Sequence, residues 1–191
     1  MRVISGTLKG KKLFAPRGVS LRPTSDRVRE SIFDILQGAL EGLRVLDLFA
    51  GTGAMGIEAL SRGAGSAVFI ENQKSSLETL RKNLSGCRLE GVSRVLGGEV
   101  EEGLRVLEGQ GGQFELIFLD PPYGKGLARR TLGRLAESRI LLPETLVVAE
   151  HSPVEELEGI FPLARVDFRK YGGTRISFFR NSRATSTDHE N

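Results

Sequence analysis

Val45-Leu46-Asp47-Leu48-Phe49-Ala50-Gly51-Thr52-Gly53-Ala54-Met55-Gly56 is the stretch that decides the fold. An apolar run with one acid passes into a loop with glycines at positions 51, 53 and 56, and a helical pattern follows. Glycines between a strand and a helix let the backbone approach a ligand closely, and the start of a helix favours negative charge. The stretch predicts a nucleotide-type binding unit of an α/β protein, although a tight strand–helix turn alone would use the same residues.

Strand and helix patterns alternate after this loop. We expect strands at residues 44–49, 67–71, 94–96, 115–120 and 146–150, and helices at residues 54–61, 75–84, 100–107 and 128–138. Repeated strand–helix units predict a parallel sheet with helices on both faces.

The two ends of the chain follow other patterns. Short strands at residues 2–4 and 12–14 predict an N-terminal hairpin, and Thr24 or Ser25 can cap a helix that we expect to reach about Leu40. Strands at residues 164–170 and 174–180 meet at Tyr171-Gly172-Gly173, which is typical of a hairpin. The sheet should therefore end with an antiparallel strand.

The excess of basic residues is concentrated near the two ends of the chain. The net charge is +3, yet residues 1–30 hold eight basic and two acidic side chains, and residues 165–183 hold six basic and one acidic. Two basic blocks around an acidic middle favour an anionic partner bound at one face, although solvated surface charge would give the same counts.

Length and composition limit the class of protein. A chain of 191 residues fits one main domain with a core of its own, and its single cysteine, Cys87, fits a reducing cytoplasm. No signal-like stretch follows Met1 and no run is long enough to span a membrane, so we expect a cytoplasmic protein. The sequence has no Cys/His cluster, and we propose no metal site.

Two acids suggest what the glycine loop binds. Glu71 ends the next expected strand, 20 residues after Gly51, where an acid can accept hydrogen bonds from ribose hydroxyls. This spacing fits a nicotinamide dinucleotide and equally any adenosine cofactor. Asp47 lies inside the strand, where a buried carboxylate needs a partner, and a cofactor ammonium group or an arginine of the chain could supply one.

Asp120-Pro121-Pro122-Tyr123 follows the apolar run at residues 116–119. Ligands bind at the carboxyl ends of strands in open α/β sheets. The prolines donate no backbone hydrogen bonds, so Asp120 and Pro121 can direct their carbonyl oxygens at a ligand. With the flat face of Tyr123 beside them, these acceptors favour a planar ligand with an amino group, such as a nucleobase.

Together these motifs resemble those of the S-adenosylmethionine-dependent amino-methyltransferases. The resemblance implies a Rossmann-like fold with a seven-stranded, mostly parallel sheet and an antiparallel last strand. It implies that S-adenosylmethionine is the cofactor and that Asp120, Pro121, Pro122 and Tyr123 hold the target amine. The cofactor residues that it implies are Thr24, Asp47, Phe49, Gly51, Gly53, Glu71 and Glu99, and Glu99 stands where the family usually has Asp.

A narrower resemblance comes from Leu21-Arg22-Pro23-Thr24-Ser25-Asp26-Arg27-Val28-Arg29-Glu30-Ser31-Ile32-Phe33 and from Tyr171-Gly172-Gly173-Thr174 with Phe178-Phe179-Arg180. These segments and the basic N-terminus resemble the bacterial 16S rRNA guanine-N2 methyltransferase family. The resemblance implies a basic β-hairpin extension at residues 1–23 and a methyltransferase domain at 24–180, and we expect the polar tail at 181–191 to be disordered. It also implies 16S rRNA, in an assembled or assembling small ribosomal subunit, as the substrate.

We therefore expect a monomer that methylates the exocyclic N2 amine of one guanine. The residues expected to contact RNA are Arg2, Lys9, Lys11, Lys12, Arg22 and Arg27. Three alternatives remain: an adenine-N6 methyltransferase of DNA or RNA, a nicotinamide-dependent dehydrogenase, and a non-catalytic RNA-binding protein with the same fold. Asp120-Pro121-Pro122-Tyr123 by itself does not choose guanine over adenine.

Overall fold

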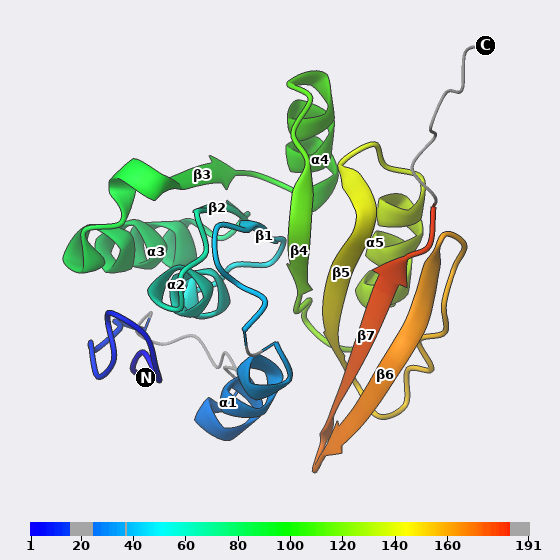
Figure 1. Ribbon diagram of the computed structural model, residues 1–191, viewed down its shortest axis with the longest axis horizontal. Coiled ribbons are helices and arrows are strands. Elements are labelled where there is room, and N and C mark those ends of the chain that lie inside the picture. The colour runs from blue at the N-terminus through cyan, green and yellow to red at the C-terminus, as the bar shows by residue number, and fades with distance from the viewer. Residues whose placement is uncertain (16–24, 37, 184–191) are drawn as a thin grey trace.

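A computed structural model describes residues 1–15, 25–36 and 38–183 (Figure 1). Its helices are α1 (Asp26–Ile35), α2 (Ala54–Ser61), α3 (Lys74–Cys87), α4 (Val100–Gly109) and α5 (Leu127–Ala136), with a 3₁₀ turn at Glu90–Val92. Its strands are β1 (Arg44–Asp47), β2 (Ser66–Glu71), β3 (Ser93–Gly97), β4 (Phe114–Leu119), β5 (Leu141–His151), β6 (Leu163–Tyr171) and β7 (Thr174–Asn181). No helix in the described ranges is long and apolar enough to cross a membrane.

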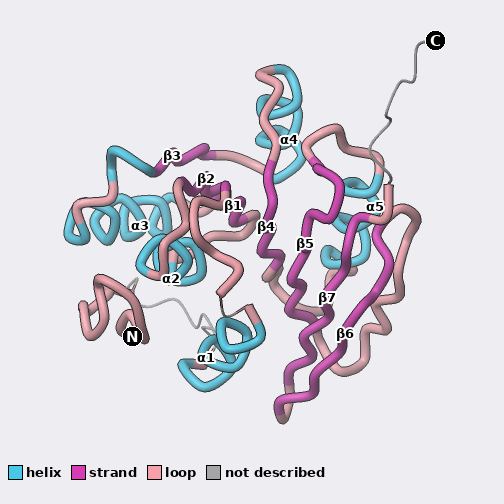
Figure 2. Tube along the Cα trace, viewed as in Figure 1, coloured by secondary structure: helices cyan, strands magenta, loops and turns pink. Residues whose placement is uncertain are grey.

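The strands form one sheet in the order β3-β2-β1-β4-β5-β7-β6 (Figure 2). The pairs from β3 to β5 are parallel, and β7 runs antiparallel to both β5 and β6. The seven-stranded α/β sheet with an antiparallel last strand is thus confirmed. The strand order reverses direction between β1 and β4, which is where open α/β sheets bind ligands.

Two apolar cores fill the two sides of the sheet because its central strands are buried on both faces. One core packs side chains of α1, α2 and α3 against the sheet, and the other packs those of α4 and α5. Phe178 belongs to the first core and Phe179 to the second, as expected for neighbours on one strand.

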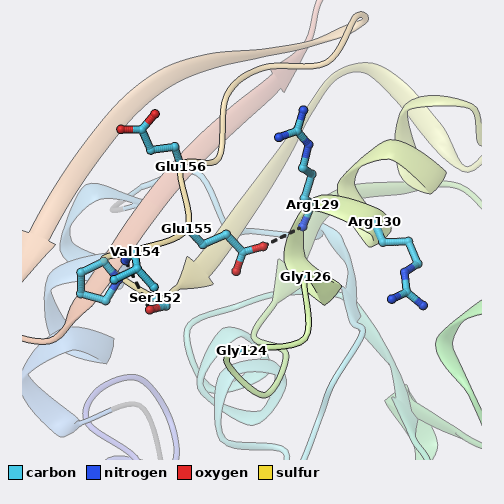
Figure 3. A pocket seen from close by; sticks show the side chains of 9 residues that line it. Gly124, Gly126, Arg129, Arg130, Ser152, Val154, Glu155 and Glu156 are labelled. Carbon is cyan, nitrogen blue, oxygen red and sulfur yellow. Dashed lines mark hydrogen bonds between the residues drawn. The ribbon is translucent and has the colours of Figure 1, made fainter.

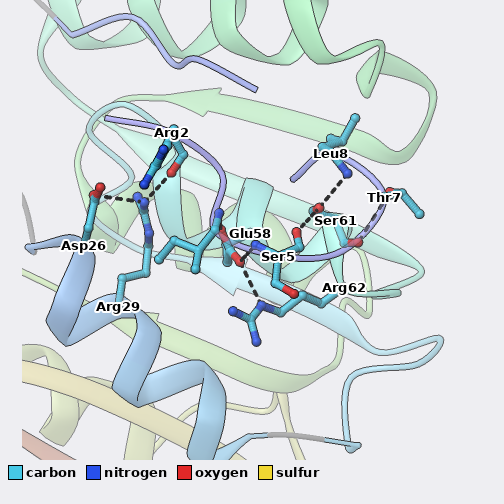
Figure 4. Close-up of polar contacts among 10 residues, drawn as sticks. Arg2, Ser5, Thr7, Leu8, Asp26, Arg29, Glu58, Ser61 and Arg62 are labelled. Atoms are coloured by element: carbon cyan, nitrogen blue, oxygen red, sulfur yellow. Dashed lines mark hydrogen bonds and ion pairs between the residues drawn. The ribbon is translucent and has the colours of Figure 1, made fainter. Parts of the chain in front are cut away.

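The N-terminal segment (residues 1–15) doubles back as expected, but with a single bridge between Arg2 and Lys12 rather than two paired strands. Its backbone is held by hydrogen bonds between its two arms, such as Val3 N–H to Lys11 O at 2.9 Å, and by α2. The buried Glu58 carboxylate accepts the N–H groups of Ile4 and Ser5 at 2.7 and 2.9 Å, and Ser61 O accepts that of Thr7 at 2.7 Å (Figure 4).

Two further elements differ in length from their predictions. Helix α1 is capped by Ser25 Oγ, as predicted, but ends at Ile35 instead of about Leu40. Gly38 has a φ of +80°, a conformation that ends a right-handed helix. Strand β7 continues to Asn181, and Ser182 N–H donates to Pro162 O at 2.9 Å, so the described order extends past Arg180. Residues 184–191 lie outside the described ranges.

A substitution at Gly56 would test how tightly α2 packs on the sheet. A Cβ at this position would lie 2.3 Å from Cε1 of the buried Phe69 ring. We predict that Gly56→Ala lowers the free energy of unfolding by about 1–3 kcal/mol, because a packed core resists an added methyl group. Urea unfolding measures this change.

The matched control is Gly86→Ala in α3, where a new Cβ meets no atom within 4 Å. This substitution should stabilise the protein by up to about 1 kcal/mol, since alanine is the better helix former. Equal unfolding midpoints for the two variants would contradict the packing argument.

Candidate active site

A cleft of about 830 Å³ opens at the carboxyl ends of β1, β2, β4 and β5. It joins the two motifs that lie far apart in the sequence: Asp47 and the glycine loop on one side, and Asp120 to Tyr123 on the other. Met1 and Ala15 also border it, which brings the N-terminal segment to its edge. Of the expected cofactor and catalytic residues, the cleft is lined by Asp47, Phe49, Gly51, Glu71, Glu99, Asp120, Pro121, Pro122 and Tyr123.

Glu71 holds the glycine loop in place. Its Oε2 accepts the N–H of Gly51 at 2.7 Å, and its Oε1 accepts the N–H of Gln73 at 2.7 Å. The carboxylate thus ties the end of β2 to the loop after β1. Lone pairs remain on both oxygens for a ligand, because a carboxylate offers about four acceptor sites.

Gly53 does not line the cleft, in contrast to Gly51. It has a φ of +80°, caps the start of α2, and a Cβ there would lie 2.4 Å from Cδ1 of Leu80. Its place in the loop is explained by the turn and by close packing.

Asp47 is a buried carboxyl with a perturbed acidity. Its side chain is 2% exposed, and its Oδ2 accepts the N–H of Gly56 at 3.3 Å. Burial raises the pKa of Asp47 to about 7; the bond from Gly56 opposes this rise, and the negative charge of Glu71 adds to it. A cation placed in the cleft beside Asp47 would stabilise its ionised form.

Glu99 lies at the exposed rim, directly before α4. Its Oε1 accepts a hydrogen bond from Asn72 Nδ2 at 2.9 Å, which links the ends of β2 and β3. Thr24, the remaining expected cofactor residue, lies outside the described ranges, as does Arg22.

Tyr123 is held by residues that the sequence did not single out. Its hydroxyl donates to Glu150 Oε1 at 2.9 Å and lies 3.1 Å from Thr174 Oγ1, so β5 and β7 together fix the ring. Burial raises the pKa of the phenol, and the neighbouring carboxylate of Glu150 raises it further. Tyr123 therefore stays a neutral hydrogen-bond donor at physiological pH.

The cleft is acidic inside and basic at one edge. Its acids outnumber its bases: Asp47, Glu71, Glu99, Glu101, Asp120 and Glu150 against Lys125, Arg130 and Arg134. Arg134 is already paired with Glu101 and Glu108, at 3.1 and 2.6 Å. This excess of negative charge suits a cationic ligand. Within the described residues, no group of three or more His, Cys, Asp or Glu could hold a metal ion.

A second, open hollow of about 860 Å³ adjoins the cleft through Arg130, which lines both (Figure 3). Arg129 and Arg130 extend from the first turn of α5, and Glu155 Oε1 accepts the N–H of Arg129 at 3.4 Å. The charged residues that line the hollow are these two arginines and Glu155 and Glu156.

The expected RNA-contacting residues of the N-terminal segment are exposed: Arg2, Lys9, Lys11 and Lys12, together with Arg27 on α1. Arg29, two residues on, is instead fully buried and donates to Arg2 O and to Asp26 Oδ1 (Figure 4). The segment also reaches the glycine loop. Asn83 accepts the N–H of Phe14 at 2.7 Å and donates to Phe14 O and to Thr52 O.

The pKa of Asp47 predicts how stability depends on pH. The unfolded carboxyl ionises near its ordinary value of 3.8, whereas the folded one ionises near 7. Between these values the folded state binds the extra proton, so this group makes the protein less stable as pH rises, and its effect levels off above pH 7. We predict that Asp47→Asn flattens this fall, as measured by urea unfolding of the ligand-free protein at pH 5 and pH 8. Asp34→Asn, at an exposed site on α1, is the control and should keep the wild-type slope.

Comparison with known proteins assigns the family. Residues 1–180 match the family described as Conserved hypothetical protein 95. The chain is 38% identical over 181 residues to YlbH of Bacillus subtilis (strain 168), covering 94% of this chain and 98% of that protein. It is 37% identical over 150 residues to Ribosomal RNA small subunit methyltransferase D of Escherichia coli (strain K12), covering 78% of this chain and 74% of the relative.

Two solved structures share this fold. The structure of yhhF from Escherichia coli superposes with a TM-score of 0.84 at 32% identity, over 96% of this chain and 99% of that one. The RNA methyltransferase from Salinibacter ruber, solved with S-adenosyl-L-homocysteine, shares the fold with a TM-score of 0.66 at 17% identity, over 88% of this chain and 99% of that one. The chain therefore belongs to the ribosomal RNA small-subunit methyltransferase family.

Proposed function

We propose that this methyltransferase uses S-adenosylmethionine to methylate the exocyclic N2 amine of one guanine in 16S rRNA. The observation that carries the proposal is the meeting of two acceptors, the Asp120 carboxylate and the Pro121 carbonyl, with an acidic cleft at the strand ends. The substrate would be the assembled or assembling small subunit, and the enzyme would act as a cytoplasmic monomer.

The residues of the cleft fit this cofactor. Asp47 is buried beside the glycine loop, where an ammonium group would compensate its charge, and Glu71 keeps acceptor sites for ribose hydroxyls. Gly51 lets the backbone approach the ligand, and Glu99 lies at the rim near Asn72 for contacts with the adenine. When bound, S-adenosylmethionine supplies a methyl group on a sulfonium, which is a good leaving group.

Asp120 and Pro121 would make the target amine a better nucleophile. The lone pair of a guanine N2 is delocalised into the ring, so the amine is a weak nucleophile. If the carboxylate and the carbonyl each accept one N–H, the lone pair is directed away from them and toward the methyl donor. Positioning then supplies most of the barrier reduction, and the Asp120 carboxylate can accept the released proton.

Tyr123 and the basic edge would hold the target nucleotide. The Tyr123 ring, fixed through its hydroxyl by Glu150 and Thr174, can stack on the base and set its plane. The base must leave its stack at a cost of a few kcal/mol. Phosphate contacts from the basic N-terminal segment and from Arg129 and Arg130 would offset that cost.

We predict that Asp120→Ala lowers kcat by about 10²–10³-fold, the usual cost of losing one transition-state hydrogen-bond partner. Affinity for S-adenosylmethionine, measured by calorimetry, should stay within about twofold of the wild type. Glu115→Ala is the control: it removes a carboxylate from the opposite end of the same strand, where it binds Arg44. Full activity of the Asp120 variant would overturn the assigned role.

Lys9 and Lys12 test the RNA-binding surface. We predict that Lys9→Ala/Lys12→Ala raises KM for small subunits. The slope of log(kcat/KM) against log[salt] should become shallower by about two, because binding releases about one counterion fewer for each phosphate contact that is lost. The control is Arg94→Ala/Arg139→Ala. It removes the same charge from exposed residues near the amino ends of β3 and β5, away from the cleft. Equal salt slopes for the two double variants would count against this surface.

The function itself is tested with small subunits from a strain that lacks the gene. The purified enzyme is incubated with these particles, or with naked 16S rRNA, and with tritiated S-adenosylmethionine. Nuclease digestion and mass spectrometry then identify the modified base and atom. N2-methylguanine at one position is expected. A product on N6 of adenine, or none on either substrate, would refute the proposal.

A further inference from the structure

Glu150 lies beside Asp120 at the mouth of the cleft. Strands β4 and β5 pair in parallel with Leu119 opposite Ala149. The residues that follow these two, Asp120 and Glu150, are therefore neighbours across the two strands. Adjacent strands are about 4.8 Å apart, and residues at equivalent positions of a parallel pair share a face. Both side chains line the cleft.

The Glu150 carboxylate is held in a fixed position. Its side chain is 8% exposed, and its Oε1 accepts the Tyr123 hydroxyl at 2.9 Å. The same hydroxyl lies 3.1 Å from Thr174 Oγ1, which restricts its movement. A rigid acceptor beside the proposed amine site is suited to reading a second atom of the same base.

The amine alone cannot distinguish the two purines that carry one. Asp120 and Pro121 would accept hydrogens from the N2 amine of guanine or from the N6 amine of adenine. The neighbouring ring position differs: N1 of guanine carries a hydrogen and donates, whereas N1 of adenine presents a lone pair. A carboxylate beside the amine site accepts the N1–H of guanine and repels the N1 lone pair of adenine.

We propose that Glu150 accepts the N1–H of the target guanine beside Asp120 and so determines the choice of guanine over adenine. The inference rests on the proposed function and assigns a specificity role within the same cleft. Asp120 and Pro121 then read the amine, Glu150 reads the ring nitrogen, and Tyr123 joins them by stacking on the base while holding Glu150 through its hydroxyl.

The test compares two substrates that share the 2-amino group. Small subunits are reconstituted from 16S rRNA made by splinted ligation, with the mapped target guanine either kept or replaced by 2-aminopurine, whose N1 is an acceptor. For the wild type we expect kcat/KM to favour guanine by at least about 10–100-fold, the usual value of one well-placed polar contact to a base. In Glu150→Gln this preference should fall by about tenfold, because an amide can donate to N1.

A purely structural role would give a different result. If Glu150 only held Tyr123, Glu150→Gln would slow both substrates equally and leave the preference unchanged, and that outcome would overturn the proposal. Glu144→Gln, on an exposed part of the same strand, is the matched control and should keep the wild-type preference. Thermal unfolding and calorimetry with S-adenosylmethionine establish that each variant is folded.

If the Glu150→Gln variant does not fold, Glu150→Asp takes its place in the test. The shorter carboxylate withdraws from N1, so the preference for guanine should again fall several-fold, and an unchanged preference overturns the proposal. Failure of the proposed function is recognised separately, because in that case the wild type methylates neither guanine-containing particles nor naked 16S rRNA at N2.

Discussion

The parallel pairing of β1 with β4 is the constraint on which the site depends. Asp47 stands opposite Phe118 in this pair, so the residues that follow each strand emerge at the same edge of the sheet. The order of the strands reverses here, and the connecting helices leave to opposite faces, which opens a space that neither side fills. Two motifs 73 residues apart, at Asp47 and Asp120, become neighbours for this reason alone.

Side chains then convert this edge into a rigid cleft. Glu71 binds the glycine loop through the N–H of Gly51, and Glu150 with Thr174 holds Tyr123. Both carboxylates come from the ends of strands next to the central pair. The sheet fixes the positions of the glycine loop and of Tyr123, and hydrogen bonds to β2, β5 and β7 fix their orientations. Little ordering is therefore left to occur when a ligand binds.

The sequence predicted the fold and the cleft-lining residues that stand at strand ends, because both depend on local patterns. Strand and helix order follows from alternating hydrophobicity, and Asp47, Glu71 and Asp120 could be placed because carboxyl ends of parallel strands share an edge. Glu150 and Thr174 were missed, since only the pairing of β5 with β4 and β7 brings them to Tyr123. The N-terminal strands are shorter than expected for a related reason: the two arms pair through Val3 and Lys11, but the N–H groups of Ile4 and Ser5 bind the distant side chain of Glu58.

Asn83 gives the N-terminal segment an influence beyond its own surface. One amide binds Phe14 through both its N–H and its carbonyl, and also binds Thr52 in the glycine loop. One side chain of α3 therefore fixes the N-terminal segment relative to the glycine loop. The basic surface of residues 1–15 is thereby kept in register with the cleft, so the two present one preformed surface to a ligand.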